Sequence, residues 1–208
     1  MKTLIKICGI RRVEDVGYIN THRPDYAGFI LTQGFRRSIT PERFCELKGC
    51  LDDEIKAVGV FVNEPLETIV RGRFADVLDV IQLHGDEDEG YITALREVFG
   101  GEIWKAVRAK SSADIEAADS LSCDRLLIDS FVTGKIGGTG KTADTGIIKA
   151  ARITKPFLAA GGISKDNAAG IIKELSPFGA DISSSVETDG IKDENKIRDI
   201  IRTIREVG

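Results

Sequence analysis

Leu4-Ile5-Lys6-Ile7-Cys8 is the first of eight short apolar runs, rich in β-branched residues, that recur at near-regular intervals along the 208-residue chain. Each run is followed by polar or glycine-rich residues and then by a stretch whose apolar residues have helical spacing. Strands that alternate with helices in this way indicate βαβ units and a parallel sheet. The eight predicted strands span residues 4–8, 26–31, 56–62, 79–83, 103–107, 125–129, 156–160 and 180–184.

Start signals precede several of the helical stretches. Thr40-Pro41-Glu42 combines a capping residue, a proline for the first helical position and an acid in the first turn. Asn63-Glu64-Pro65 predicts another helix entry, and Ser164 is a candidate cap for the apolar pattern that follows it. The last helix is predicted over 193–207, where the apolar residues that share one face are Ile197, Ile200, Ile201 and Ile204.

Eight βα units without an intervening linker predict a single (β/α)₈ barrel domain over residues 1–208. The competing architecture is an open, doubly wound sheet, which more often has five or six strands and, in its nucleotide-binding form, a G-x-G-x-x-G turn after the first strand. Here the first strand ends in Cys8-Gly9-Ile10-Arg11, which is not that turn. The barrel is therefore the expected fold.

Composition and charge exclude several classes of protein. The net charge of −4 argues against a nucleic-acid partner that relies on bulk positive charge. We expect no membrane partner, because no apolar run approaches the roughly 20 residues that cross a bilayer. The start, Met1-Lys2-Thr3-Leu4-Ile5-Lys6, is charged too soon for a signal peptide, so we expect a cytoplasmic location.

The four cysteines form no metal-binding pattern with the two histidines. We therefore expect no metal site, and in a reducing compartment we expect free thiols. Cys45 and Cys50 fall in an amphipathic stretch with helical spacing, and both are expected to be small buried hydrophobes.

In this barrel the active site forms at the carboxyl ends of the strands. Polar or glycine residues at the predicted strand ends are therefore candidates for chemistry. A cysteine, a histidine and an aspartate at three such ends are more than folding alone requires. In chain order the candidates are Cys8, Arg36 or Arg37, Asn63, His84, Arg108, Asp129, Gly161-Gly162 and Ser183 to Ser185.

Three of the loops suit a phosphate group. Barrels often bind phosphate with the loops after strands seven and eight, where Gly161-Gly162 and Ser183-Ser184-Ser185 lie. Glycine lets the backbone approach an oxyanion closely, and free N–H groups bind it. Gly137-Gly138-Thr139-Gly140, after strand six, is a third such segment.

Cys8 and Asp129 are the acid–base candidates. A thiol has an ordinary pKa of about 8.5 and becomes a base when its thiolate is stabilised. A carboxyl group that acts as an acid near neutral pH must stay partly protonated, which requires desolvation. A base and an acid on opposite sides of a small substrate suit a proton relocation such as an aldose-to-ketose isomerisation.

The residues alone leave three kinds of protein open. One is an isomerase that uses Cys8 and Asp129. Another is a different phosphosugar barrel enzyme such as an epimerase, although a metal-dependent epimerase would need several histidine and acidic ligands and only His84 is available at a strand end. The third is a non-catalytic sensor of a phosphorylated ligand, which would need the glycine and serine loops but not the Cys8–Asp129 pair.

Six segments, in order along the whole chain, resemble phosphoribosylanthranilate isomerase, the TrpF family of the tryptophan pathway. KICGI and QLHGDE are the most specific of them. The segments are Lys6-Ile7-Cys8-Gly9-Ile10, Gln82-Leu83-His84-Gly85-Asp86-Glu87, Leu127-Ile128-Asp129-Ser130, Gly137-Gly138-Thr139-Gly140-Lys141-Thr142, Ala159-Ala160-Gly161-Gly162-Ile163 and Ser184-Ser185-Val186-Glu187.

This resemblance implies an Amadori rearrangement of N-(5-phosphoribosyl)anthranilate without a cofactor or metal. It implies that Asp129 is the general acid at the ribose ring oxygen and that Cys8 is the general base at C2. It places Arg37 near the anthranilate carboxylate, where a guanidinium can bind with two hydrogen bonds, and His84 near the mouth. Asp181 would help to order the site, and the phosphate would bind to loops that contain Gly138, Gly140, Gly161, Gly162, Ser184 and Ser185.

The chain departs from the family pattern at three points. Phe35-Arg36-Arg37 replaces the usual Ser-Pro-Arg, and Ser184-Ser185-Val186-Glu187 has a serine where the family has glycine. An aromatic residue common after the Gly-Lys-Thr segment is missing from Thr142-Ala143-Asp144-Thr145. None of these changes touches Cys8 or Asp129. The partner we expect is thus a small phosphosugar, and the chain is expected to be a monomer or a homodimer.

Overall fold

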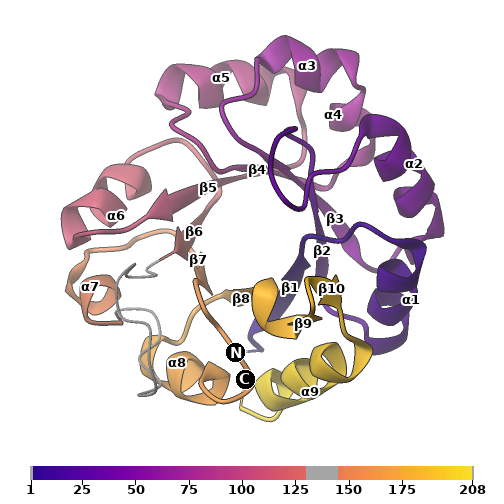
Figure 1. Cartoon of the computed structure of the whole chain (residues 1–208). Coiled ribbons are helices and arrows are strands. Elements are labelled where there is room, and N and C mark those ends of the chain that lie inside the picture. The colour runs from indigo at the N-terminus through magenta and orange to yellow at the C-terminus, as the bar shows by residue number, and fades with distance from the viewer. Residues whose placement is uncertain (1, 130–144, 208) are drawn as a thin grey trace.

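Eight parallel strands close into a barrel in the computed structural model, which describes residues 2–129 and 145–207 (Figure 1). Each strand pairs in parallel with the next along the chain, and the eighth pairs with the first. The predicted barrel is confirmed, each strand lying within a residue or two of its predicted bounds. The strands are β1 Leu4–Cys8, β2 Tyr26–Ile30, β3 Lys56–Phe61, β4 Val80–Leu83, β5 Glu102–Arg108, β6 Arg125–Asp129, β7 Phe157–Ala160 and β8 Gly179–Ile182.

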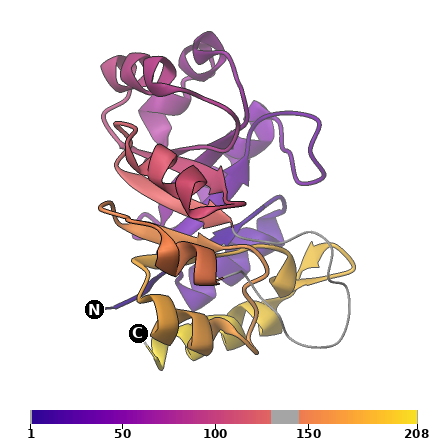
Figure 2. The same cartoon turned by 90° about the vertical axis from the view of Figure 1, so that its left-hand side faces the viewer.

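Helices surround the barrel as an outer layer (Figure 1). Both chain ends lie at one end of the barrel, and a hairpin of β9 (Glu187–Thr188) and β10 (Ile191–Lys192) lies at the other (Figure 2). Among the described residues, no helix is long and apolar enough to cross a membrane. The helices are α1 Val13–His22, α2 Pro41–Cys50, α3 Leu66–Arg71, α4 Phe74–Val77, α5 Glu89–Val98, α6 Ser112–Asp119, α7 Thr145–Ala150, α8 Ala168–Leu175 and α9 Glu194–Arg205.

Two of the helix-start predictions hold in detail. Helix α2 begins at Pro41, and the Thr40 hydroxyl accepts a hydrogen bond from the backbone N–H of Arg43. Helix α3 begins directly after Pro65. Helix α9 lies within the predicted range, with its four isoleucines buried against the barrel.

The predicted cap at Ser164 is wrong. Helix α8 begins at Ala168, after a turn in which the side-chain oxygen of Asn167 accepts a hydrogen bond from the backbone N–H of Ser164. The carbonyl of Ser164 accepts the N–H of Ala168, so Ser164 opens the turn rather than the helix.

The predicted burial of Cys45 and Cys50 is also wrong, because both are exposed. Phe44 and Leu47 occupy the inward face of α2, and the Phe44 ring packs edge-on against Phe29, with centroids 5.2 Å apart. Successive helical residues are rotated by about 100°, so Cys45 faces outward. The helix itself is predicted correctly, but Cys45 and Cys50 do not belong to its buried face.

Side chains alternate between the two faces of each strand. Those facing outward form the main core with the helices. Inside the barrel, an apolar cluster includes Tyr26 and Trp104, whose rings pack edge-to-face with centroids 4.9 Å apart, together with Val58, Val80, Leu127 and Leu158. This packing fills the amino-terminal part of the barrel and leaves the inward positions at the carboxyl ends for polar groups.

Candidate active site

A cavity of about 430 Å³ opens at the carboxyl ends of the strands, and residues from all eight strands contribute to its wall. This is the end where (β/α)₈ enzymes place their chemistry. The lining residues are Cys8, Ile30, Phe35, Arg37, Val60, Val62, Gln82, His84, Arg108, Leu127, Asp129, Ala160, Gly161, Gly162, Ile163, Asp181, Ser183, Ser184 and Ser185.

Most of the predicted site residues meet in this cavity. Within the described part of the chain, every residue that we predicted to be catalytic or to bind substrate lines it: Cys8, Arg37, His84, Asp129, Asp181, Gly161, Gly162, Ser184 and Ser185. Gly138 and Gly140 lie outside the described residues. Of the further candidates, Arg108 and Ser183 line the cavity, whereas Asn63 faces a different pocket, between the β3–α3 and β4–α5 loops.

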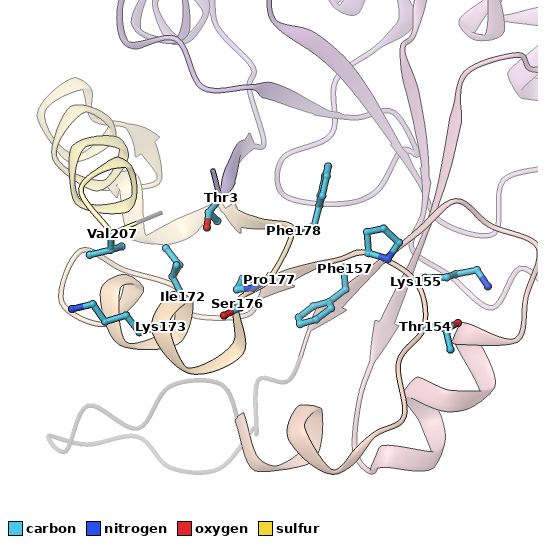
Figure 3. A pocket seen from close by; sticks show the side chains of 11 residues that line it. Thr3, Thr154, Lys155, Phe157, Ile172, Lys173, Ser176, Pro177, Phe178 and Val207 are labelled. Carbon is cyan, nitrogen blue, oxygen red and sulfur yellow. The ribbon is translucent and has the colours of Figure 1, made fainter. Parts of the chain in front are cut away.

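A larger cavity, of about 550 Å³, lies at the opposite end of the barrel (Figure 3). It is bounded by Thr3 before β1, Phe157 at the start of β7, Phe178 just before β8 and Val207 beyond α9. Its lining contains none of the predicted site residues. Volume alone therefore does not identify the site, and the cavity at the carboxyl ends is the better candidate because a thiol, an imidazole and carboxyl groups line it.

Cys8 is the last residue of β1, and its side chain is almost completely buried at the cavity wall. Gly28 on the neighbouring strand leaves the room for it, since a Cβ there would lie 2.9 Å from the Cys8 sulfur. The next residue, Gly9, has a φ of +84°, and the side chain of Arg37 packs where a Cβ would stand. Two glycines therefore fix the position of the thiol and of the chain that leaves it.

Lys6 precedes Cys8 by two residues and is fully buried. Its ammonium group donates to Asp181 Oδ1 at 2.9 Å, and the two residues are register partners on β1 and β8. Burial by itself lowers the pKa of Lys6, but the Asp181 carboxylate and the Cys8 thiol outweigh it, so that the pKa is raised. Lys6 is therefore a cation inside the barrel.

His84 follows β4 and stands above Gln82 on the same side of the chain. The Gln82 amide nitrogen lies 2.8 Å from His84 Nδ1 and donates to it, which places the imidazole hydrogen on Nε2. Burial and then the charge of Lys6 lower the pKa of His84. A neutral imidazole thus presents an N–H donor, and the buried Gln82 Oε1 has no hydrogen-bond partner among the described residues.

Asp129 ends β6 and lies beside Arg108, its register partner on β5. The Asp129 carbonyl accepts the backbone N–H of Ala109, which fixes the two strand ends together. Arg108 is exposed at the mouth of the cavity. The pair puts a carboxyl group and a guanidinium on the wall formed by β5 and β6.

Glu187 on β9 accepts hydrogen bonds from three cationic side chains at the edge of the cavity. Arg37 donates to it through Nε and Nη2 at 2.6 and 2.8 Å, Lys192 donates at 3.2 Å, and the more exposed Arg36 donates at 2.7 Å. Burial alone raises the pKa of Glu187, but hydrogen bonds from Arg37 and the charge of Lys192 lower it to about 2. Of the two arginine candidates, Arg37 lines the cavity and Arg36 does not.

The loops after β7 and β8 lie together on one side of the cavity. Gly161 and Gly162 have φ values of +87° and +69°, a conformation that favours glycine. Ser184–Val186 forms a single 3₁₀ turn, and the Ser185 hydroxyl donates to the Ile163 carbonyl at 2.5 Å. These contacts bring the glycine and serine loops into one surface suited to an anion.

Among the described residues, no group of three histidine, cysteine or acidic side chains is placed to hold a metal ion. The cavity wall offers thiol, carboxyl, imidazole and guanidinium groups instead, with Lys6 and Lys192 behind the wall. These are groups for proton transfer and for binding anions.

Sequence reasoning missed Lys6, Gln82 and Lys192. Lys6 and Gln82 carry a detectable signal, because each is a polar residue two positions before a predicted site residue and therefore on the same strand face. Lys192 lies in the hairpin, where no strand was expected, and the sequence gives no comparable sign of its burial.

Comparison with known proteins identifies close relatives along the whole chain. The profile of the N-(5'phosphoribosyl)anthranilate (PRA) isomerase family matches residues 5–203. N-(5'-phosphoribosyl)anthranilate isomerase from Clostridium acetobutylicum is 42% identical over 203 residues, which cover 97% of each chain. The corresponding enzyme from Acetivibrio thermocellus is 40% identical over 211 residues, covering 98% of this chain and 96% of the relative.

Solved structures of the same family share the fold of this chain. Phosphoribosyl anthranilate isomerase from Thermus thermophilus superimposes with a TM-score of 0.85 at 29% identity, covering 99% of this chain and 100% of the other. A phosphoribosyl anthranilate isomerase in complex with reduced 1-(o-carboxyphenylamino)-1-deoxyribulose 5-phosphate gives a TM-score of 0.82 at 28% identity, covering 98% and 99%. A structure of monomers generated from the dimeric phosphoribosylanthranilate isomerase of Thermotoga maritima gives a TM-score of 0.82 at 30% identity, with the same coverage.

Proposed function

The chain belongs to the N-(5'-phosphoribosyl)anthranilate isomerase family, and we propose that Cys8 and Asp129 perform the two proton transfers of its reaction. The chain catalyses the Amadori rearrangement of N-(5'-phosphoribosyl)anthranilate to 1-(2-carboxyphenylamino)-1-deoxyribulose 5-phosphate, an aldose-to-ketose isomerisation in tryptophan biosynthesis. The family match decides for the isomerase over the epimerase and sensor alternatives.

The first proton transfer opens the ribose ring. Asp129 gives its proton to the ring oxygen, the bond from C1 to that oxygen breaks, and the anthranilate nitrogen supplies the electron pair that makes an iminium ion. Asp129 suits this step because it stands at the end of β6, on the cavity wall and only partly exposed to water. Arg108 beside it is placed to stabilise the carboxylate that remains.

The second proton transfer shifts the double bond. The Cys8 thiolate removes the proton from C2, and the electron pair of that C–H bond forms the C1–C2 double bond of an enolamine as the iminium is neutralised. The enolamine then moves a proton from its hydroxyl oxygen to C1, which gives the ketone. One proton has passed in from Asp129 and one out to Cys8, and exchange with water restores both groups.

The observation that carries this assignment is that the Cys8 and Asp129 side chains line one cavity from well-separated strands. In the ring of eight strands, β7 and β8 lie between β6 and β1 on the shorter way round. An acid and a base that approach a small substrate from different sides can act on neighbouring atoms of it.

The rest of the cavity suits the two ends of the substrate. We infer that the loops with Gly161, Gly162, Ser184 and Ser185 bind the phosphate and that Arg37 faces the anthranilate carboxylate, with its own orientation set by Glu187. His84, as a neutral donor, would bind near the mouth, and Asp181 would hold Lys6. Gly138 and Gly140 remain predicted phosphate contacts.

A homologue from Thermotoga maritima is dimeric, and for this chain we retain both a monomer and a homodimer as proposals. Sedimentation of the purified chain at several concentrations separates the two. A cytoplasmic location, and the lack of nucleic-acid and membrane partners, also remain predictions, which fractionation of cells that produce the chain would test.

A fluorescence assay tests the activity itself. Freshly made phosphoribosylanthranilate is incubated with the purified chain, and its consumption is followed over time. We expect turnover by the parent chain and by Cys45→Ser, an exposed cysteine on α2 that serves as the matched control, and a loss of 10²–10⁴-fold in Cys8→Ala and Asp129→Asn. Near-parental turnover in either of the last two, with the fold intact, would show that its role is assigned wrongly.

A further inference from the structure

We propose that Lys6 is a positioning residue that stabilises the thiolate form of Cys8 from within the barrel, and that Asp181 fixes the Lys6 ammonium group in place. The proposal rests on the role of Cys8 as the general base. Neither Lys6 nor its partner needs to touch the substrate for this effect, because a charge acts through the protein interior.

The side chains of Lys6 and Cys8 both pack against Gly28 on the neighbouring strand. Lys6 and Cys8 point to one face of β1, since they are two residues apart on a strand. A Cβ built on Gly28 would lie 2.9 Å from the Cys8 sulfur and 3.1 Å from Lys6 Cε. The sulfur and Lys6 Cε are therefore at most about 6 Å apart. The ammonium group on that carbon is close enough for Cys8 to help raise the pKa of Lys6.

Burial makes this interaction strong. The Lys6 side chain is fully excluded from solvent, so little water screens its charge from the sulfur. The thiol of Cys8 contributes to raising the pKa of Lys6. An interaction between two groups is mutual, so the attraction that helps Lys6 keep its proton also favours the thiolate of Cys8.

Several other charged groups face Cys8 from neighbouring elements. Arg37, from the β2–α2 loop, and Lys192, from β10, are both within electrostatic range of the sulfur, but both donate to Glu187. Burial lowers the pKa of Lys192, whereas that of Lys6 is raised. His84, just after β4, is neutral at pH 7 because burial and the charge of Lys6 lower its pKa. Of the two lysines near the sulfur, Lys6 is therefore the one whose charged form is favoured, and unlike Arg37 it does not donate to Glu187.

Asp181 stabilises the buried charge of Lys6 and also acts on the Cys8 thiol. The 2.9 Å bond to Asp181 offsets part of the cost of burying the Lys6 ammonium group, and in Asp181→Asn the Cys8 thiolate would remain as a counter-ion for Lys6. The same carboxylate also opposes part of the field of Lys6 at the sulfur. Removing Lys6 and neutralising Asp181 should therefore shift the ionisation of the thiol in opposite directions.

Alkylation of Cys8 by iodoacetamide as a function of pH tests the proposal without substrate. A parent carrying Cys45→Ser and Cys50→Ser removes the two exposed thiols. Cys123 is buried and its burial raises its pKa, so it reacts slowly, and peptide mass analysis confirms which thiol is modified. In this background we compare Lys6→Met, Lys6→Arg, Asp181→Asn and Lys105→Met.

Lys6→Met should move the midpoint of the alkylation curve upward by about one pH unit, which lowers the alkylation rate at pH 7 about tenfold. We expect kcat at pH 7 to fall by a similar factor and to recover at high pH, with KM changed less than about twofold. Lys6→Arg should keep the midpoint near that of the parent, and Asp181→Asn should leave it unchanged or move it downward.

Lys105→Met is the matched control. Lys105 is also a buried lysine on a barrel strand, paired with Glu87 at 2.8 Å, but it does not line the cavity. Its loss should lower stability and leave the alkylation curve of Cys8 in place. If Lys6→Met does not fold, Lys6→Met combined with Asp181→Asn replaces it and is compared with Asp181→Asn alone, above which its midpoint should lie by about one pH unit.

A curve for Lys6→Met that superimposes on the parent overturns the proposal, and so does an equal upward shift in Asp181→Asn or Lys105→Met. These outcomes differ from a failure of the proposed function. Turnover that survives in Cys8→Ala would remove Cys8 from the reaction, while the alkylation curves would still measure the effect of Lys6 on the sulfur.

Discussion

Lys6 and Asp181, 175 residues apart, are register partners on the first and last strands of the barrel, and their side chains form a 2.9 Å ion pair in its interior. The pair lies where β8 closes onto β1. It therefore joins the two ends of the sheet as well as standing beside Cys8. A buried pair of this kind is costly to break from one side, because the remaining charge has no partner.

Asp181→Ala tests that cost. It leaves Lys6 as an uncompensated cation in the barrel, and we expect the free energy of unfolding to fall by about 3 kcal/mol or more. Asp181→Asn keeps the shape and one acceptor, so it should lose less. Urea unfolding followed by circular dichroism measures both, and equal stability of Asp181→Ala and the parent would show that the pair contributes nothing to closure.

Gly28→Ala should lower activity. The added methyl group would lie 2.9 Å from the Cys8 sulfur and 3.1 Å from Lys6 Cε, so the thiol must move. Because a small displacement of a reacting group slows catalysis strongly, we expect kcat to fall at least about tenfold.

Gly17→Ala on α1 provides the comparison, since nothing lies within 4 Å of a Cβ there. That variant should keep full activity and gain up to about 1 kcal/mol of stability from the better helix former. If Gly28→Ala kept parental kcat, the space over Gly28 would not control the position of the thiol.

The pH dependence of stability tests the group around Glu187. Its folded-state pKa of about 2 lies below the ordinary value of 4.5. A lowered pKa stabilises the fold above the unfolded pKa, and this stabilisation is lost as the pH falls from about 5 towards 2. Glu187→Gln should therefore be less stable than the parent at pH 7, with the difference shrinking towards pH 2. A difference independent of pH would contradict this reading, and thermal unfolding across that range measures it.

His84 should titrate below the ordinary value for histidine. Burial and the charge of Lys6 lower its pKa, so the imidazole is neutral at pH 7. Proton NMR of the ring should show a midpoint below 6.5, and Lys6→Met should move that midpoint upward because a nearby positive charge has been removed. A midpoint above 6.5 in the parent would mean that a carboxylate dominates the surroundings of His84.

The eight-fold repeat of strand and helix could be predicted from the sequence because apolar periodicity and helix caps are local features. Arg37, His84 and Asp129 could be placed near one another because the carboxyl ends of parallel strands share one end of the barrel. The resemblance to a known family, rather than spacing, supplied their roles.

What could not be predicted depends on partners distant in the chain. The pairing of Lys6 with Asp181 and of Arg37 with Glu187 crosses 175 and 150 residues, and a single sequence contains no record of such contacts. The exposure of Cys45 depends on how Phe44 packs against Phe29, and the turn at Ser164 depends on the side chain of Asn167. Tertiary contacts decided the two ion pairs and the exposure of Cys45, whereas the turn at Ser164 was a local choice between two capping candidates three residues apart.

Turnover and affinity of Cys8→Ala and Asp129→Asn, measured side by side, test most directly whether one cavity joins a sulfur base to a carboxyl acid. Affinity is taken from calorimetric titration with the reduced product analogue, and turnover from the fluorescence of the substrate. We expect both variants to bind the analogue within about threefold of the parent and to turn over at least a hundredfold more slowly. A variant that binds normally and turns over within about fivefold of the parent would contradict the account.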